Sequence, residues 1–364
     1  MTSEFWRGRR VFLTGHTGFK GSWLSLWLQH MGAQVTGYAL APNDRPSLFA
    51  QAEIGDNLNS IFADVRDLGA LQNAMQESQP EVVIHMAAQA LVRESYAKPV
   101  DTYATNIMGT VHLLESVRNT PGVRAVVNVT TDKCYENHEW IWGYRENEAM
   151  GGHDPYSSSK GCSELVTAAY RNSFFSAENY ASHGVAIASA RAGNVIGGGD
   201  YARDRLIPDI VTAFAQGKRI SIRQPCAIRP WQHVLEPLRG YLSLAEKLYL
   251  EGPTYASAWN FGPRQDDAQT VQWMVERLAK LWGHSAQWHL DTDAHPHEAN
   301  SLRLDITKAQ QLLHWQPALT LSTALSWVIQ WYQSAAAGES SKDLCLAHIR
   351  QYEEILAQWP HDHS

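Results

Sequence analysis

Short apolar runs alternate with longer segments of helical periodicity through the first half of the chain. The runs are continuously apolar, which is typical of strands covered on both faces and therefore of a parallel sheet between two helix layers. Six runs are predicted as strands: Arg10 to Thr14, Gln34 to Leu40, Asn57 to Ala63, Val82 to Met86, Arg124 to Val129 and Val185 to Ala190. The pattern predicts an α/β fold with a doubly wound parallel sheet.

The rhythm changes after residue 193, where a Gly-rich turn at Gly197 to Gly199 is followed by many Trp, Pro and His residues. We expect a nucleotide-binding domain over residues 1–193 and a smaller, mixed α/β substrate lobe over 194–364, with an interleaved boundary. Leu, Ala and Trp at helical spacing predict a late helix from Leu319 to Gln333 that serves packing.

Composition narrows the class of protein. With 364 residues, of which 44% are apolar, the chain can bury a sizeable core, and its net charge of −7 argues against a surface that wraps nucleic acid. The four cysteines form no CxxC pair, so neither a zinc site nor a disulfide framework is expected. No apolar run approaches the roughly 20 residues that span a bilayer, and no cleavable signal pattern precedes the first strand. We expect a soluble, cytoplasmic protein without a bound metal.

The first predicted strand runs directly into a GxxGxxG turn formed by Gly15, Gly18 and Gly21, with a helix expected from Ser22. Glycines let backbone amides approach a pyrophosphate, and a helix N-terminus favours negative charge. The position after the first strand favours a Rossmann-type dinucleotide site over an ordinary Gly-rich turn. Its candidate cofactor-binding residues are Gly15, Thr17, Gly18, Phe19 and Lys20.

Further candidates follow the next strands. Asp64 and Val65 come after the third strand, where they could meet an adenine, and Ala87 and Ala88 follow the fourth, where small residues leave room for a flat ligand. A helix cap for Asp64 and tight packing for the alanines are the alternatives. The chain lacks a carboxylate at the end of its second strand to bind the ribose of NAD.

Near that strand end the sequence offers Asn43, which could bond a ribose hydroxyl, and Arg45, which could accept the 2′-phosphate of NADP. These residues therefore leave the choice between NAD and NADP open.

Tyr156 and Lys160 stand four residues apart in a helical pattern, downstream of a strand that ends in Thr130 and Thr131. Residues at this spacing share a helix face, so the hydroxyl and the ammonium can meet at one site. We expect the ammonium to lower the phenol pKa from about 10, so that Tyr156 can accept a proton from a sugar hydroxyl. An exposed Tyr-Lys pair is the alternative.

These motifs occur in the order seen in extended short-chain dehydrogenases/reductases, together with Thr105-Asn106 and the stretch from Arg191 to Gly197. The resemblance covers roughly residues 8–305. Within that superfamily, Thr131-Asp132-Lys133 resembles the Thr-Asp-Glu triplet of nucleotide-sugar 4,6-dehydratases, and the lysine is similar to that of members acting on CDP-D-glucose.

The resemblance implies NAD as cofactor and a redox-neutral cycle in which C4 is oxidised, water is lost across C5 and C6, and the hydride returns to C6. It implies Thr131 as donor to the C4 oxygen, Asp132 as acid at C6 and Lys133 as base at C5. A strand-end cap and an exposed ion pair are the alternatives for these three residues. The resemblance also suggests a deoxysugar route toward a cell-surface polysaccharide.

Other ligand contacts are expected along the same motifs. Gln89, Asn106 and Arg191 are candidates for the cofactor, with Tyr156 and Lys160 at its nicotinamide end. The candidates for the substrate, CDP-glucose or a related nucleotide sugar, are Gln89, Arg93, Thr131, Asn194, Arg205, Arg229 and His297.

The segment from Val100 to Val117 and the helix after Tyr156 are amphipathic. The resemblance implies a homodimer built on these helices, whereas an intramolecular core is the alternative. Two rival functions are a 4-epimerase, which has no need for an acid and a base after Thr131, and a catalytically silent dinucleotide-binding regulator, which need not retain the Tyr-Lys pair.

Overall fold

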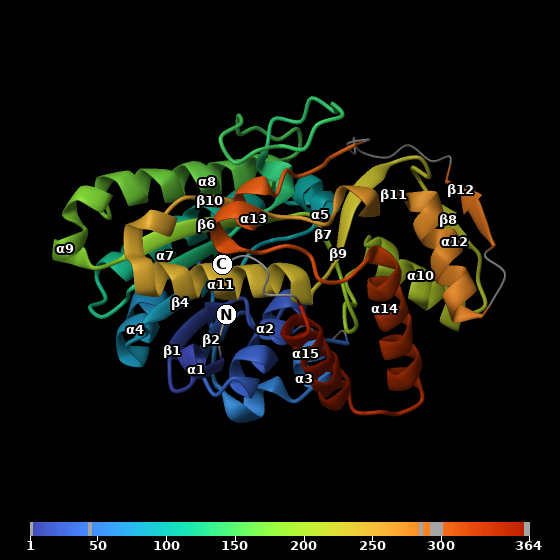
Figure 1. The fold of residues 1–364 in the computed structure, drawn as a ribbon, viewed down its shortest axis with the longest axis horizontal. Coiled ribbons are helices and arrows are strands. Elements are labelled where there is room, and N and C mark those ends of the chain that lie inside the picture. Colours follow the sequence, from blue (N-terminus) through green and yellow to red (C-terminus); the bar gives the residue numbers. More distant parts are fainter. Residues whose placement is uncertain (1–2, 43–45, 284–286, 292–300, 360–364) are drawn as a thin grey trace.

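The computed structural model describes residues 3–42, 46–283, 287–291 and 301–359. Seven parallel strands form its central sheet in the order β10-β6-β5-β4-β1-β2-β3 (Figure 1). They are β1 (Arg10–Thr14), β2 (Gln34–Ala39), β3 (Asn59–Phe62), β4 (Val82–His85), β5 (Ala125–Val129), β6 (Ala186–Ala192) and β10 (Ala258–Phe261). The predicted doubly wound sheet is confirmed.

Helices cover both faces of the sheet because its strands are buried on both sides. One face packs on α2 (Phe19–His30), α11 (Leu235–Glu251) and α15 (Ser341–Ala357). The other packs on α4 (Leu68–Ser78), α7 (Gly109–Arg118) and α8 (Pro155–Ser173). In Figure 1, α8 runs along the upper side of the molecule, while α2 and α15 lie below α11.

The segments after β6 form two smaller sheets and further helices. A three-stranded sheet joins β7 (Asn194–Ile196), β9 (Ile228–His233) and β11 (Ala268–Thr270), and β8 (Ile220–Ile222) pairs with β12 (Trp288–Leu290). The further helices are α10 (Leu206–Ala215), α12 (Val271–Trp282), α13 (Thr307–Leu313) and α14 (Leu321–Ala336). The late helix predicted from Leu319 therefore begins at Leu321, where the Thr320 side chain caps it.

Short helices complete the described chain. They are α1 (Ser3–Trp6), α3 (Leu48–Gln51), α5 (Val92–Ala97), α6 (Pro99–Tyr103) and α9 (Tyr180–His183). A π-helical turn, Ala104–Met108, joins α6 to α7.

The central sheet crosses the expected domain limit at residue 193. Strand β10 pairs with β6, and α11 and α15 cover the same sheet, although all three elements come from the second half of the sequence. The pattern Ala-Trp-Asn-Phe of β10 is short and interrupted by a polar residue, so apolar continuity did not reveal this strand. The division into 1–193 and 194–364 stays a prediction.

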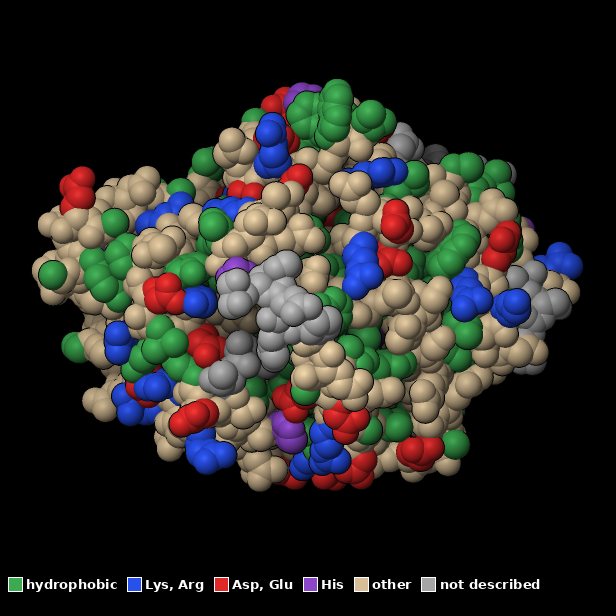
Figure 2. Space-filling model, in the orientation of Figure 1, with side chains coloured by type: hydrophobic (Ala, Val, Ile, Leu, Met, Phe, Trp, Pro, Cys, Tyr) green, Lys and Arg blue, Asp and Glu red, His purple; other side chains and the backbone are tan. Residues whose placement is uncertain are grey.

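Charges of both signs are interspersed on the face drawn in Figure 2. No helix in the described ranges is long and apolar enough to cross a membrane. Within the same ranges, no group of three or more His, Cys, Asp or Glu side chains could hold a metal ion.

Candidate active site

The carboxyl ends of the central strands open into a cavity of about 1720 Å³. Its wall combines the turn after β1, the ends of β4, β5 and β6, the segment 199–209, and parts of β8 and β9. Ligands of open α/β sheets bind at this edge, where the strand order reverses, and here that point lies between β1 and β4.

The turn after β1 needs glycine because two backbone segments approach closely. Gly15 has φ +78°, and a Cβ at this position would lie 2.7 Å from the backbone nitrogen of Ala87. A Cβ on Gly21 would lie 2.0 Å from the carbonyl oxygen of Gly15. The predicted spacing of glycines therefore has a steric cause, and it holds the start of α2 at the cavity.

Helix α2 begins at Phe19, earlier than the predicted start at Ser22. Its N-cap is Gly18, which supplies no side-chain cap, so the first amides of the helix are left for another acceptor. Thr17 bonds the Leu40 carbonyl at 3.0 Å and fixes the turn against β2. This uncapped, glycine-lined helix start fits the pyrophosphate of a dinucleotide.

Asp64 lies on the cavity wall as predicted, with Val65 packed beside it against Gly109. The side chain and backbone of Arg66 bond the Asp64 carboxylate and lower its pKa. Asn43 and Arg45 lie outside the described residues.

Ala87 and Ala88 line the cavity, whereas Gln89 and Asn106 do not. Asn106 is buried, and its amide bonds the backbone of Gln89 at 2.9 and 3.0 Å and the hydroxyl of Ser159 at 2.8 Å. Their side-chain amides tie the loop after β4 to neighbouring helices, so the predicted ligand contact of Gln89 and Asn106 gains no support from the cavity lining and stays a prediction.

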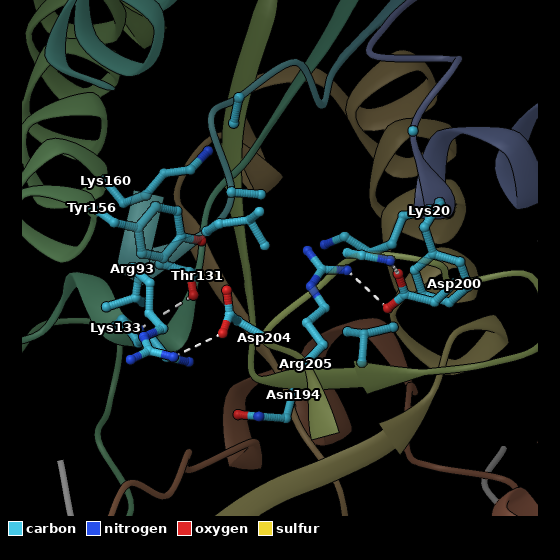
Figure 3. A pocket seen from close by; sticks show the side chains of 18 of the residues that line it. Lys20, Arg93, Thr131, Lys133, Tyr156, Lys160, Asn194, Asp200, Asp204 and Arg205 are labelled. Carbon is cyan, nitrogen blue, oxygen red and sulfur yellow. Dashed lines mark hydrogen bonds and ion pairs between the residues drawn. The ribbon is translucent and has the colours of Figure 1, made fainter. Parts of the chain in front are cut away.

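Helix α8 places the two central side chains of the site. Asp154 caps it by accepting from the Ser157 amide at 2.9 Å, so the helix starts just before Tyr156. Tyr156 and Lys160 are 8% and 6% exposed and both line the cavity, and the Tyr156 side chain is hydrogen-bonded to Thr131 at the end of β5. Figure 3 shows these three residues on one side of the cavity.

The expected lowering of the Tyr156 pKa is not observed. Burial raises the pKa of Tyr156 to about 12, and the hydrogen bond from Thr131 opposes this only in part. Lys160 donates to the Val129 carbonyl at 3.2 Å, and burial lowers its own pKa to about 8. Desolvation therefore dominates both groups, which the spacing of a Tyr-Lys pair cannot reveal.

Asp132 and Lys133 begin a short 3₁₀ turn, Asp132–Cys134, after β5. Lys133 lines the cavity and pairs with Asp132 at 3.2 Å. Asp132 is fully buried and does not line the cavity. Its Oδ1 also accepts from the Thr131 hydroxyl at 3.0 Å, and its Oδ2 has no hydrogen-bond partner among the described residues. That free oxygen lies against Gly193, where an added Cβ would approach it to 3.0 Å.

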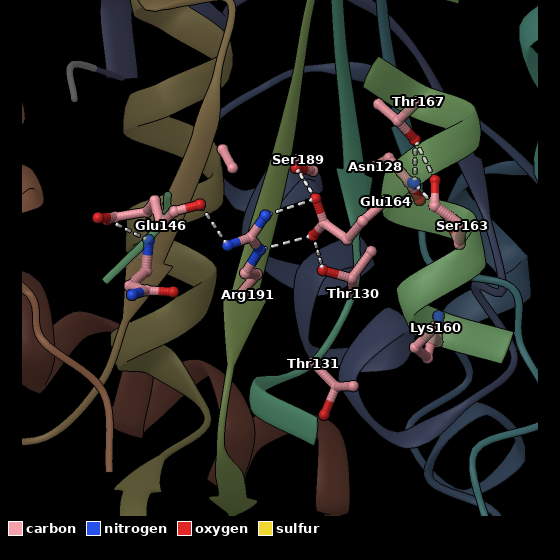
Figure 4. A network of polar contacts seen from close by, with 12 residues as sticks. Asn128, Thr130, Thr131, Glu146, Lys160, Ser163, Glu164, Thr167, Ser189 and Arg191 are labelled. Atoms are coloured by element: carbon pink, nitrogen blue, oxygen red, sulfur yellow. Dashed lines mark hydrogen bonds and ion pairs between the residues drawn. The ribbon is translucent and has the colours of Figure 1, made fainter. Parts of the chain in front are cut away.

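Arg191 does not reach the cavity, so its predicted contact with the cofactor is corrected. Figure 4 shows its guanidinium turned toward Glu164, with which it forms two bonds of 2.9 Å. It also donates to the Tyr135 hydroxyl and the Glu146 carbonyl. The Glu164 carboxylate in turn accepts from Thr130 and from Ser189 on β6, both at 2.5 Å. Arg191 and Glu164 thus connect β5, β6 and α8 beneath the site.

The substrate half of the cavity holds four of the predicted residues. Asn194, Arg205, Arg229 and Arg93 all line it, and the buried Oδ1 atom of Asn194 has no hydrogen-bond partner in the part of the chain that the structure describes. His297 lies outside the described residues.

Two aspartates of this region were not predicted. Asp200 pairs with Arg205 at 2.9 Å, and Asp204 pairs with Arg93 at 2.9 Å (Figure 3). The second pair joins residues 111 positions apart. A single sequence carries no signal for such a contact, although the Gly-rich turn before Asp200 marks the loop.

A parallel sheet with a phosphate-binding turn after β1 and a buried Tyr-Lys pair at its carboxyl edge defines a dinucleotide-dependent enzyme site of the short-chain dehydrogenase/reductase type. A family model described as GDP-mannose 4,6 dehydratase matches residues 12–327. The chain belongs to this family of nucleotide-sugar 4,6-dehydratases, as its motifs predicted.

Individual relatives agree with this assignment. A CDP-glucose 4,6-dehydratase from Salmonella typhimurium is 54% identical and covers 97% of this chain and 98% of its own length. A dTDP-glucose 4,6-dehydratase from Haemophilus influenzae is 24% identical over 88% of this chain and 97% of its own.

Solved structures share the fold. A UDP-glucose 4-epimerase from Thermotoga maritima, solved with UDP-glucose, has a TM-score of 0.76 at 21% identity, covering 90% of this chain and 99% of its own. A dTDP-glucose 4,6-dehydratase from Bacillus anthracis, solved with NAD, has a TM-score of 0.75 at 23% identity, covering 90% and 97%.

Removing the carboxylate beneath the site should destabilise the whole enzyme. We expect Glu164→Gln to lower the free energy of unfolding by about 3 kcal/mol, because the buried Arg191 charge would lose its anionic partner. Urea unfolding followed by circular dichroism measures this. Glu178→Gln on the surface is the matched control and should leave the midpoint unchanged. Equal stability of both variants would contradict a structural role for the pair.

Proposed function

We propose that this enzyme converts CDP-D-glucose into CDP-4-keto-6-deoxy-D-glucose and water, with NAD as its cofactor. The observation that carries the proposal is the Thr131, Lys133, Tyr156 and Lys160 constellation on the cavity wall of a chain 54% identical to a CDP-glucose 4,6-dehydratase. The four cysteines, which are free, and the intracellular supply of nucleotide sugars support a cytoplasmic place in deoxysugar synthesis for a surface polysaccharide such as O-antigen.

The cofactor would be held by the residues that already shape one end of the cavity. The start of α2 fits its pyrophosphate, Asp64 and Val65 lie where the adenine would bind, and Lys160 stands at the nicotinamide end. NAD supplies a hydride acceptor at C4 of the sugar and the same hydride for return to C6.

The chain's own groups move the protons. Tyr156 removes the proton of the 4-hydroxyl, and its hydrogen bond with Thr131 orients both side chains toward the place where the C4 oxygen would bind. Lys160, buried beneath it, supplies positive charge that favours the phenolate. Because the pKa of Tyr156 is raised to about 12, the fraction of phenolate that can accept the proton of the 4-hydroxyl increases as the pH rises toward that value.

Once C4 is a ketone, the C5 proton is acidic and Lys133 is the base placed to remove it. Loss of the C6 hydroxyl as water needs one proton, for which Asp132 is our candidate. It does not line the cavity itself, so it would act through Thr131 and Lys133, which do and which its carboxylate contacts. Two protons are removed, one from the 4-hydroxyl and one from C5, and two are supplied, one to the leaving 6-hydroxyl and one to C5 when the hydride reaches C6. The cycle therefore balances and consumes no external reductant. On the substrate side, Asn194 and Arg229 support binding of the diphosphate.

A panel of nucleotide sugars tests the proposal. Purified enzyme with NAD should convert CDP-glucose, and much more slowly dTDP- or GDP-sugars, into a product lighter by one water, measured by mass spectrometry. We expect Tyr156→Phe to reduce the rate by roughly 10²- to 10⁴-fold, since general acid-base catalysis contributes about that much. A product of unchanged mass but altered sugar configuration would identify a 4-epimerase instead. No reaction with any of the sugars would favour the catalytically silent dinucleotide-binding regulator.

The role of Lys133 has its own readout. In D₂O, the wild-type enzyme should incorporate deuterium at C5 of the product, because the C5 proton leaves and returns. Lys133→Met should slow both dehydration and C5 exchange by at least about 10²-fold while leaving C4 oxidation measurable as transient NADH absorbance. Full C5 exchange in this variant would exclude Lys133 as the base.

We also propose a homodimer through α6, α7 and α8. These helices pack against one another, and apolar residues on them are exposed: Val100 on α6 is 79% and Leu165 on α8 is 61% exposed, and Met108, in the π-helical turn between α6 and α7, is 45% exposed. Such positions are costly in water and suit a helix bundle between two copies.

Light scattering should give about twice the 40.8 kDa of one chain, or a higher even multiple. Leu165→Lys should lower that mass, because it places a charge in the apolar contact. Leu312→Lys on α13, where the leucine is 54% exposed, is the control and should not change it. A monomeric wild-type enzyme would contradict the proposal.

A further inference from the structure

Lys20 is a buried lysine whose charge has no carboxylate of its own. It is the second residue of α2 and lines the cavity, with its ammonium 5.6 Å from the ring centroid of Tyr241 on α11. With respect to the part of the chain that the structure describes, its side chain makes no hydrogen bond or ion pair. A cation in this position needs either a ligand or a low pKa.

The charges around Lys20 are mainly positive. Lys160, Arg205 and Lys133 act on it as cations, and Asp132 is the carboxylate that opposes them. Figure 3 shows Lys20 and Arg205 extending from one side of the cavity toward Tyr156 and Lys160 on the other. The Lys20 ammonium is therefore directed at the catalytic groups.

Each of the other cations has a carboxylate partner nearby. Arg205 pairs with Asp200 at 2.9 Å and Lys133 with Asp132 at 3.2 Å, while Glu164 stabilises the charge of Lys160. Burial and the neighbouring cations lower the pKa of Lys20 to about 7. Among the described residues, no carboxylate forms an ion pair with Lys20, and Asp132 offsets the surrounding positive charge only in part.

We propose that Lys20 makes the site discriminate between the two redox states of the cofactor, by weakening binding of the oxidised form relative to the reduced form. The inference rests on the proposed function, because it requires a nicotinamide ring next to Tyr156 and Lys160. The oxidised ring carries a positive charge that it loses on accepting a hydride, so repulsion by Lys20 is relieved by that step. Oxidation of the sugar at C4 is thereby favoured.

A simple phosphate contact by Lys20 makes a different prediction. Both redox states carry the same pyrophosphate, so a lysine that binds it strengthens both equally. The ratio of the two dissociation constants separates these roles without any measurement of turnover.

The test compares wild type with Lys20→Met by isothermal titration calorimetry with NAD and NADH. At about pH 6, where Lys20 is protonated, we expect the ratio Kd(NAD)/Kd(NADH) to fall roughly tenfold in the variant, with NADH affinity changed less than about twofold. Lys218→Met, which removes an exposed lysine after α10, is the charge control and should keep the wild-type ratio.

The pH dependence gives a second, independent readout. Lys20 carries its charge below about pH 7 and loses it above, so wild-type affinity for NAD should rise with pH through this range while that for NADH stays flat. Lys160, Lys133, Arg205, Asp132 and Tyr241 face Lys20 and remain in the variant, so only the difference between the two proteins is assigned to Lys20.

The outcomes are distinct. An unchanged ratio, or an equal loss of both affinities, overturns the inference, and the second result identifies a phosphate contact. Failure of the wild-type enzyme to bind either nucleotide refutes the proposed function itself. If Lys20→Met does not fold, Lys20→Gln replaces it, and a wild-type ratio that does not change with pH overturns the inference by itself.

Discussion

The buried pair of Glu164 and Arg191 is the interaction on which the geometry of the site depends. Its carboxylate and guanidinium join α8 to the ends of β5 and β6, and the partners Thr130 and Ser189 satisfy the remaining oxygen lone pairs. A buried ion pair repays its desolvation only when its geometry and hydrogen bonding are this complete. Because Thr131 follows Thr130 and Lys160 stands one helical turn before Glu164, this pair fixes the distance between the strand end and the helix that carry the chemistry.

A second constraint is electrostatic. Lysines and arginines on the cavity wall come from α2, α5, α8 and β9, from the turn after β5 and from the loop before α10, and Arg93, Lys133 and Arg205 among them pair with carboxylates. Such a site is suited to two ligands that each carry a diphosphate, the cofactor and the sugar nucleotide. Burial lowers the pKa of both Lys20 and Lys160, and the neighbouring cations lower that of Lys20 further, so binding of anions and protonation of these lysines are linked.

Much of the fold was readable from the sequence. The six predicted strands form with ends shifted by at most two residues, because continuous apolar runs can be buried only between two helix layers. The glycine turn and the Tyr-Lys spacing were also predictable, because each depends on local geometry. Glycine is needed where two backbone segments lie close together, and residues four apart share a helix face. Strand β10 was missed because its four residues show no such pattern.

The sequence alone determined the order of the first six strands and the class of chemistry, and most of the candidate residues that it offered line the cavity, since these follow from motifs in which neighbouring positions act together. Only the tertiary structure decided that Arg191, Asn106 and Gln89 hold the framework and do not line the cavity, because their partners come from distant segments. The tertiary structure also determined the direction in which the pKa values of Tyr156 and Lys20 shift. Burial sets those, and burial depends on what the whole chain packs around a group.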